Sequence, residues 1–206
     1  VSDNIAHDLK TPLTRLRNRA EQALGSGGDE AKYRAALERT IEESDGLIRT
    51  FNALLMIARA ESGRARDNMS ESVAAEIARS VGELYEPLAE EKGLTLVVEA
   101  PSAVPVHGSR ELISQALANL VDNAIKYATL AKRDGDESQV TVKAASEGER
   151  VLLIVADQGP GIPEAMRDRV VERFVRLDQS RTVPGSGLGL SLAAAVARLH
   201  GGTLKF

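Results

Sequence analysis

The stretch Asn119-Leu120-Val121-Asp122-Asn123-Ala124-Ile125-Lys126-Tyr127 decides how the second half of the chain is interpreted. It lies in an expected helix over residues 110–129, whose apolar residues form one strong face. Steps of four, three and one residues place four polar side chains near a common face: Asn119, Asn123, Lys126 and Tyr127. Asparagine oxygens suit Mg²⁺, the lysine can meet a phosphate, and the tyrosine offers a surface beside a base or ribose. A solvated helix face carries the same residue types, so the stretch needs support from its neighbours.

The segment Asp157-Gln158-Gly159-Pro160-Gly161-Ile162 follows an expected strand over residues 150–156. An aspartate at a strand end can accept a hydrogen bond from an exocyclic amine such as that of adenine. Gly159 and Gly161 allow the backbone to pass close to a ligand. Taken alone, the segment is also consistent with a plain turn.

The segment Gly185-Ser186-Gly187-Leu188-Gly189-Leu190 opens an expected helix over residues 186–200. Backbone N–H groups at a helix start, with the helix dipole behind them, favour an anion. The G-x-G-x-G spacing differs from the Rossmann turn, and the G-K-[ST] of a P-loop is missing. Arg176 and Arg181 lie in the preceding segment, which glycines and prolines interrupt, and both could reach phosphates if that segment folds over them. A flexible hinge and solvated arginines are the simpler alternatives, and Phe174 alone indicates only a small apolar anchor.

The other chemical signal is near the start of the chain, in His7-Asp8-Leu9-Lys10-Thr11-Pro12-Leu13. Neutral imidazole is a competent nucleophile near neutral pH, and Asp8 can accept a hydrogen bond from the other ring N–H of His7. Thr11 lies one helical turn further on, where its hydroxyl could orient a water. Pro12 cannot donate to the carbonyl of Asp8, so the helix should bend just after His7. A single His-Asp pair on a helix is otherwise typical of a solvated surface.

Apolar periodicity predicts two long helices in the first part of the chain. One covers residues 1–24, the Gly-rich stretch 25–28 forms a turn, and the other runs to about Ser62. One hairpin cannot cover both apolar stripes, whereas two hairpins of a homodimer can do so as a four-helix bundle. The domains expected are a helical hairpin over 1–62, a polar linker over 63–69 and a second domain over 70–206.

The second domain mixes helices and strands. Residues 70–92 are expected to be helical, and strands are expected at 94–99, 104–108, 139–145, 150–156 and 203–206. This order predicts an α/β sandwich with helices on one face, which makes the whole chain α+β.

The composition excludes several classes of protein. The chain has 206 residues, a net charge of −4 and no cysteine, which rules out disulfides and thiolate metal sites. The charge gives no electrostatic reason to expect nucleic acid binding. No apolar run approaches the roughly 20 residues needed to span a bilayer, so we expect a cytoplasmic location, with a membrane anchor only in a missing upstream segment.

The seven residues from His7 match the pattern H-[DE]-x-x-[ST]-P-[LR] and resemble the phosphoacceptor box of sensor histidine kinases. The other segments resemble, in family order, the N, G1, F and G2 boxes of the histidine-kinase ATP-binding domain, a relative of Hsp90, gyrase B and MutL. The resemblance covers nearly the whole chain. It implies a protein-histidine kinase that uses ATP and Mg²⁺ to phosphorylate His7 and passes the phosphoryl group to an aspartate on a response regulator receiver domain.

The resemblance also implies individual roles. Asp8 assists as a base, Thr11 supports phosphatase chemistry, Asn123 is a Mg²⁺ ligand and Asp157 contacts adenine. The glycines at 159, 161, 185, 187 and 189 shape the lid over ATP. The nucleotide-binding set also contains Asn119, Lys126, Tyr127, Arg176, Arg181 and Leu188.

Three alternatives remain open from the sequence. One is an ATPase of the same superfamily that drives conformational change, against which the His7 segment argues. Another is a dimeric scaffold with an inactive pocket. The third, within the family, is a bifunctional enzyme in which phosphatase activity dominates.

Overall fold

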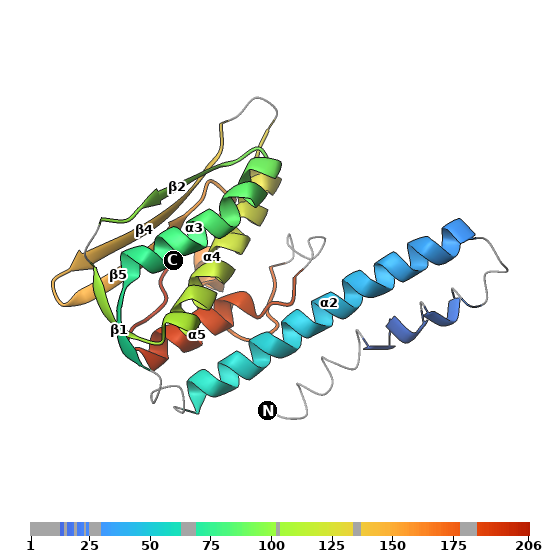
Figure 1. The fold of residues 1–206 in the computed structure, drawn as a ribbon, viewed down its shortest axis with the longest axis horizontal. Coiled ribbons are helices and arrows are strands. Elements are labelled where there is room, and N and C mark those ends of the chain that lie inside the picture. Colours follow the sequence, from blue (N-terminus) through green and yellow to red (C-terminus); the bar gives the residue numbers. More distant parts are fainter. Residues whose placement is uncertain are drawn as a thin grey trace. The chain divides into compact units, whose positions relative to one another are not determined.

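The computed structural model describes residues 13–14, 16–18, 20–22, 24, 30–62, 69–101, 104–133, 137–177 and 185–206. The chain divides into two compact units, Val1–Leu55 and Met56–Phe206, which are taken separately here. The first is helical, and the second combines helices with two sheets (Figure 1). The expected α+β class is therefore confirmed.

The long helix α2 spans Glu30–Glu61 and confirms the second expected helix to within a residue. The described residues between 13 and 24 are also helical, whereas the expected Gly-rich turn and most of the linker lie outside the described residues. Several apolar side chains of α2 are more than two-fifths exposed and recur at helical spacing: Leu37, Ile41, Ile48, Phe51 and Leu55. None of the described helices has the length and hydropathy needed to cross a membrane.

In the second unit, the first element after α2 is a strand where a helix was expected. β1 (Ser70–Val73) pairs antiparallel with β3 (Pro105–Gly108), from Ser70 opposite Gly108 to Val73 opposite Pro105. The expectation of a helix from residue 70 was wrong for these four residues, because their backbone groups bond to a segment far away in the chain. The helix α3 follows directly, over Ala74–Glu91.

The core of this unit lies between two helices and a three-stranded sheet. The sheet has the order β2-β4-β5, with β2 (Thr95–Glu99) parallel to β4 (Gln139–Glu147) and β4 antiparallel to β5 (Arg150–Ala156). α3 and α4 (Arg110–Ala131) cover one face of it (Figure 1). Alternate residues of β4 point into this layer, so Val140, Val142 and Ala144 are fully buried. The predicted sandwich with helices on one face is confirmed.

Two boundaries near the end of the chain differ from the expectation. α5 spans Gly189–Leu199 rather than starting at residue 186, because Gly187 has a left-handed backbone (φ 71°) that no helix continues through. Residues 203–206 were expected to form a strand, but they carry no strand hydrogen bonds in the structure. A strand forms only where a neighbouring strand pairs with it. The alternation of apolar and polar residues over 203–206 does not by itself provide such a partner.

Candidate ATP-binding site

The helix α4 carries the polar stretch Asn119–Tyr127. Ser109 caps its start, its side chain accepting a hydrogen bond from the N–H of Leu112 (3.4 Å). One side of α4 is buried in the core through Leu112, Ile113, Leu117, Val121, Ala124, Ile125 and Ala128. Burial of this side leaves the side chains of Asn119, Asn123 and Lys126 at or near the surface. The amide nitrogen of Asn119 donates to the carbonyl of Gln115 (2.8 Å), so its amide oxygen is the atom available to a ligand.

The start of α5 lies directly against these asparagines. A Cβ atom added at Gly189 would be 3.4 Å from Nδ2 of Asn123 and 3.5 Å from Oδ1 of Asn119. Leu188, just before the helix, has a fully buried side chain, so only its backbone can face a ligand. The positive end of the α5 dipole and the two amide side chains therefore meet at one place, although they are some 70 residues apart in the chain.

Two cationic side chains lie beside Gly185. A Cβ atom added there would be 2.8 Å from Nζ of Lys126, and Nη1 of Arg176 donates to its carbonyl (3.0 Å). Burial lowers the pKa of Lys126 below its usual 10.5, against the opposing effect of Asp122, and Arg176 lowers it further. Nζ of Lys126 also lies 5.8 Å from the centre of the Tyr127 ring. A bound anion would therefore stabilise the charged form of Lys126, which is partly removed from water in the free protein.

Asp157 directly follows β5, and its side chain bonds to the loop after it. Its Oδ1 accepts a hydrogen bond from the backbone N–H of Gly159 (2.7 Å), which holds the exposed carboxylate in one orientation. A Cβ atom at Gly159 would be 3.3 Å from Cβ of Tyr127, so this loop and the end of the Asn119–Tyr127 stretch are in contact. Gly161, with φ 70°, has open space around it.

Phe174 is linked by its backbone to Gly187, just before α5. Phe174 has φ 63°, a left-handed conformation unusual for an aromatic residue, and its N–H donates to the carbonyl of Gly187 (2.9 Å). A Cβ atom at Gly187 would lie 2.9 Å from the backbone of Phe174, so only glycine fits there. The sequence indicated a small apolar anchor at Phe174, whereas the structure shows a role for its backbone, which bonds to Gly187.

Several predicted site residues lie outside the described residues, namely His7, Asp8, Thr11 and Arg181. The structure brings residues of α4 close to Asp157 and Gly159 after β5, to Gly185 and to the start of α5, whereas no contact of Gly161 with the others is seen. The described part of the chain holds no group of three His, Cys, Asp or Glu side chains able to bind a metal ion. A cation at this site would therefore depend on amide oxygens and on oxygens of its ligand, a donor set that fits Mg²⁺ with phosphate.

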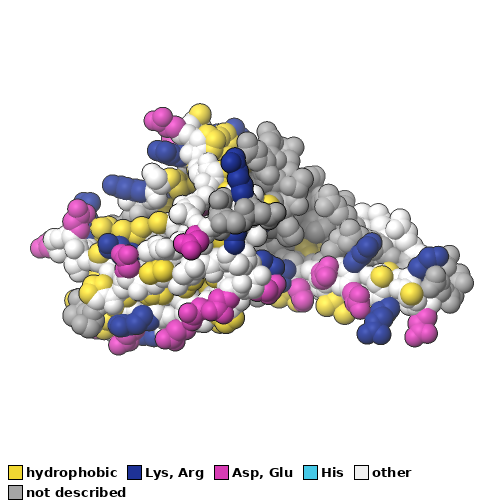
Figure 2. Space-filling view, turned by 90° about the horizontal axis from the view of Figure 1, so that it is seen from above, with side chains coloured by type: hydrophobic (Ala, Val, Ile, Leu, Met, Phe, Trp, Pro, Cys, Tyr) yellow, Lys and Arg dark blue, Asp and Glu magenta, His cyan; other side chains and the backbone are white. Residues whose placement is uncertain are grey.

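The face of the described residues seen in Figure 2 carries charges of both signs. Asp and Glu side chains are interspersed there with Lys and Arg, with hydrophobic patches between them. This pattern agrees with the net charge of −4.

The chain resembles known proteins along its whole length. One family model, the His Kinase A (phospho-acceptor) domain, matches residues 1–63. Another, the histidine kinase-, DNA gyrase B- and HSP90-like ATPase, matches residues 108–206. The sensor protein IrlS of Burkholderia pseudomallei is 33% identical over 204 residues, covering 98% of this chain and 42% of IrlS.

Two solved structures extend the comparison. Full-length ShkA in complex with AMPPNP gives a TM-score of 0.66 at 26% identity, covering 97% of this chain and 40% of ShkA. The histidine kinase ThkA in complex with the response regulator protein TrrA gives a TM-score of 0.72 at 20% identity, covering 98% of this chain and 55% of ThkA. The latter likeness concerns the fold alone.

The fold and the site define an ATP-binding domain of the type that histidine kinases share with DNA gyrase B and HSP90. Since a phosphoacceptor domain precedes it, the chain belongs to the sensor histidine kinases of two-component systems. It spans 42% of the length of each of two curated sensor proteins that it matches, IrlS and the probable sensor protein PcoS of Escherichia coli.

Proposed function

We propose that this chain catalyses ATP-dependent phosphorylation of its own His7 and passes the phosphoryl group to an aspartate on the receiver domain of a response regulator. The observation that carries the proposal is the contact between the start of α5 at Gly189 and the amide side chains of Asn119 and Asn123. A helix N-terminus and two amide side chains meet at Gly189, and the Lys126 ammonium lies beside Gly185, four residues earlier; an ATP phosphate chain requires such groups.

Each side chain has a separate task in this proposal. Lys126 and Arg176, both next to Gly185, neutralise phosphate charge. Asp157, oriented by the N–H of Gly159, accepts a hydrogen bond from the exocyclic amine of adenine. Tyr127 lies beside the base or ribose. Asn123, with Asn119 as its neighbour one turn earlier, would hold Mg²⁺, which supplies charge neutralisation at the phosphates when bound. Arg181 would join Arg176 over the phosphates.

The chemical step assigns His7 the role of nucleophile. A lone pair of one ring nitrogen forms a bond to the γ-phosphorus of ATP while the bond from that phosphorus to the β,γ-bridging oxygen breaks, and ADP leaves. The proton on the other ring nitrogen passes to Asp8, so the product is a neutral phosphorylated imidazole. Such a phosphoramidate is labile, which suits onward transfer to a carboxylate of the receiver domain. Thr11 would position the water that later hydrolyses the partner's phosphoryl group.

A homodimer is part of the proposal. The row of exposed apolar side chains on α2, from Leu37 to Leu55, is the kind of surface that a second hairpin covers in a four-helix bundle. ATP and response regulators are cytoplasmic, so the reaction would take place there, with any membrane attachment outside this segment.

The decisive experiment is incubation of the chain with γ-labelled ATP and Mg²⁺, followed by mapping of the labelled residue. We expect an acid-labile label on His7 that disappears in His7→Gln and when Mg²⁺ is chelated, while AMPPNP still binds to His7→Gln. The matched control is His107→Gln, which changes an exposed histidine on β3. This variant should label at the rate of the wild type.

Each alternative gives a different result. ATP hydrolysis with no stable label would indicate an ATPase that drives conformational change, and AMPPNP binding with neither label nor hydrolysis would indicate a scaffold. A label that persists in His7→Gln would contradict the assignment of the acceptor.

A further inference from the structure

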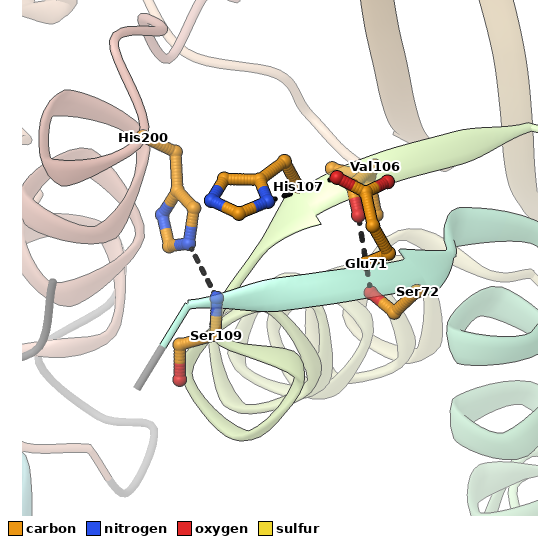
Figure 3. A network of polar contacts seen from close by, with 6 residues as sticks. All are labelled: Glu71, Ser72, Val106, His107, Ser109 and His200. Atoms are coloured by element: carbon orange, nitrogen blue, oxygen red, sulfur yellow. Dashed lines mark hydrogen bonds and ion pairs between the residues drawn. The ribbon is translucent and has the colours of Figure 1, made fainter. Parts of the chain in front are cut away.

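A hydrogen bond joins the residue that caps the end of α5 to the residue that caps the start of α4 (Figure 3). Nε2 of His200, just after α5, accepts a hydrogen bond from the backbone N–H of Ser109, just before α4 (3.0 Å). Gly189, at the opposite end of α5, lies against Asn119 and Asn123. The two helices are therefore antiparallel neighbours, and the two contacts lie roughly 15 Å apart along α4.

The tautomer of His200 follows from its other contact. Nδ1 lies 2.8 Å from the carbonyl oxygen of Val196, which can only accept, so Nδ1 carries the proton. Nε2 then bears a lone pair, which matches the donor at Ser109. The neutral ring thus bonds to its own helix on one side and to α4 on the other.

This contact completes the cap of α4. In a capping box, a Glu or Gln at the third helical position returns to the N–H of the capping residue. Here that position is Leu112, which cannot accept, and His200 of another helix takes its place. The neighbouring residue makes room for the ring, because a Cβ atom at Gly108 would lie 2.6 Å from Nε2 of His200.

Ser109 is itself fixed to the rest of the domain. It follows β3 directly, and β3 is tied to β1 by its backbone ladder. One side-chain contact adds to the ladder, since Ser72 donates to the carbonyl of Val106 (3.4 Å). Nδ1 of His107 also lies 2.9 Å from Glu71, but this pair is exposed and contributes little (Figure 3). The partner of His200 is thus part of a braced frame rather than a loose loop.

The rest of the buried face of α5 is mostly apolar. Three small side chains in its middle, Ala193, Ala194 and Ala195, are flanked by the buried side chains of Leu192, Val196 and Leu199. Such packing favours close approach of the two helices, but apolar contact has no direction. A directional hydrogen bond at one end of the pair can therefore decide where the other end lies.

We infer that His200 is a positioning residue: its bond to Ser109 sets the register of α5 along α4 and so holds the phosphate-binding start of α5 against Asn119 and Asn123. This inference rests on the proposed use of that site for ATP. Without the bond, α5 samples other registers. The apparent affinity for nucleotide then falls in proportion to the fraction of molecules in the binding register.

A matched pair of variants tests the inference. The amide oxygen of His200→Gln can reach the N–H of Ser109, whereas His200→Asn is one methylene too short but can still bond to its own helix end. For His200→Asn we expect the Kd for AMPPNP and the KM for ATP to rise about three- to tenfold with little change in kcat. For His200→Gln we expect both constants within about twofold of the wild type. Val196→Ala, which removes buried methyl groups of the same helix end, should lower the thermal midpoint and leave KM unchanged.

The inference is overturned if the Asn and Gln variants behave alike, or if the Asn variant loses kcat with KM unchanged, since that result reflects only a smaller folded fraction. The two proposals fail in distinguishable ways. A wild-type chain that binds AMPPNP without labelling His7 contradicts the kinase proposal, while the affinities of the two variants still decide the role of His200.

Discussion

Two long helices, α4 and α2, bear similar apolar stripes but complete them differently. α4 buries Leu117, Val121 and Ile125 almost fully against the sheet of its own unit. α2 leaves Leu37, Ile41 and Phe51 more than half exposed. α4 is also capped at its start by Ser109 and His200, both from its own chain. The apolar face of α4 is buried within its own chain, whereas α2 exposes an apolar face that a second molecule can cover.

The difference separates two roles within one kinase. An ATP site needs groups fixed relative to each other, which a core closed within one chain provides. In the proposed reaction, the phosphoacceptor hairpin is reached by the ATP domain and by a receiver domain in turn, and its stability can come from association instead. The following predictions test this division.

Truncation of the α4 core should have the largest effect. Leu117, 1% exposed, becomes alanine in Leu117→Ala, which should lower the free energy of unfolding of the ATP domain by about 2–5 kcal/mol. Denaturant unfolding should show the same midpoint at low and high protein concentration, because the core is complete in one chain. Leu130→Ala is the control, since Leu130 is 57% exposed on the same helix. A midpoint that moves with concentration would contradict the division.

Truncation of the α2 stripe should act on association. Phe51→Ala should weaken the dimer by roughly 1–2 kcal/mol, or about five- to thirtyfold in the dissociation constant, and leave the ATP-domain transition unchanged. Sedimentation at a series of protein concentrations measures the shift. Leu84→Ala, on an exposed leucine of α3, should leave the dimer as it is. Equal dissociation constants for Phe51→Ala and the wild type would remove Phe51 from the interface.

The smallest expected effect concerns pH and Lys126. Its pKa is lowered, chiefly by burial, so the side chain loses its proton at a pH below 10.5 in the free protein. Bound phosphate favours the charged form, so binding takes up a proton in that range and affinity for AMPPNP should fall with rising pH, by about tenfold or less. Titration calorimetry in buffers of different ionisation enthalpy measures both quantities. Lys126→Arg should bind with little pH dependence, and a similar slope in both proteins would exclude Lys126 as the source.

Much of the fold follows from local sequence patterns. The apolar face of residues 110–129 identified α4 and the alternation in residues 139–145 identified β4, each to within two residues at either end. The order of the polar segments also predicted which residues would meet. Asn119, Asn123 and Gly189 are neighbours because the helices that carry them pack together.

The errors have a common physical cause, which is that distant partners decide the local structure. β1 is polar and short, and only its pairing with β3 makes it a strand. The start of α5 is delayed by Gly187, whose backbone is held by Phe174. The serine before an expected helix predicts a cap at Ser109. No sequence pattern, however, identifies His200 at the end of another helix as the acceptor for its N–H.

The strands of the two sheets of the ATP domain alternate along the chain. β1 pairs with β3 across β2, and β2 pairs with β4 across β3. As the chain emerges from the ribosome, β2 has no parallel neighbour until residues 139–147 have been made, although α3 and α4 are already available to it. Synthesis that pauses before that point would expose an unpaired strand edge, which is a known route to aggregation. Any fragment of this domain designed for study should therefore extend beyond β4.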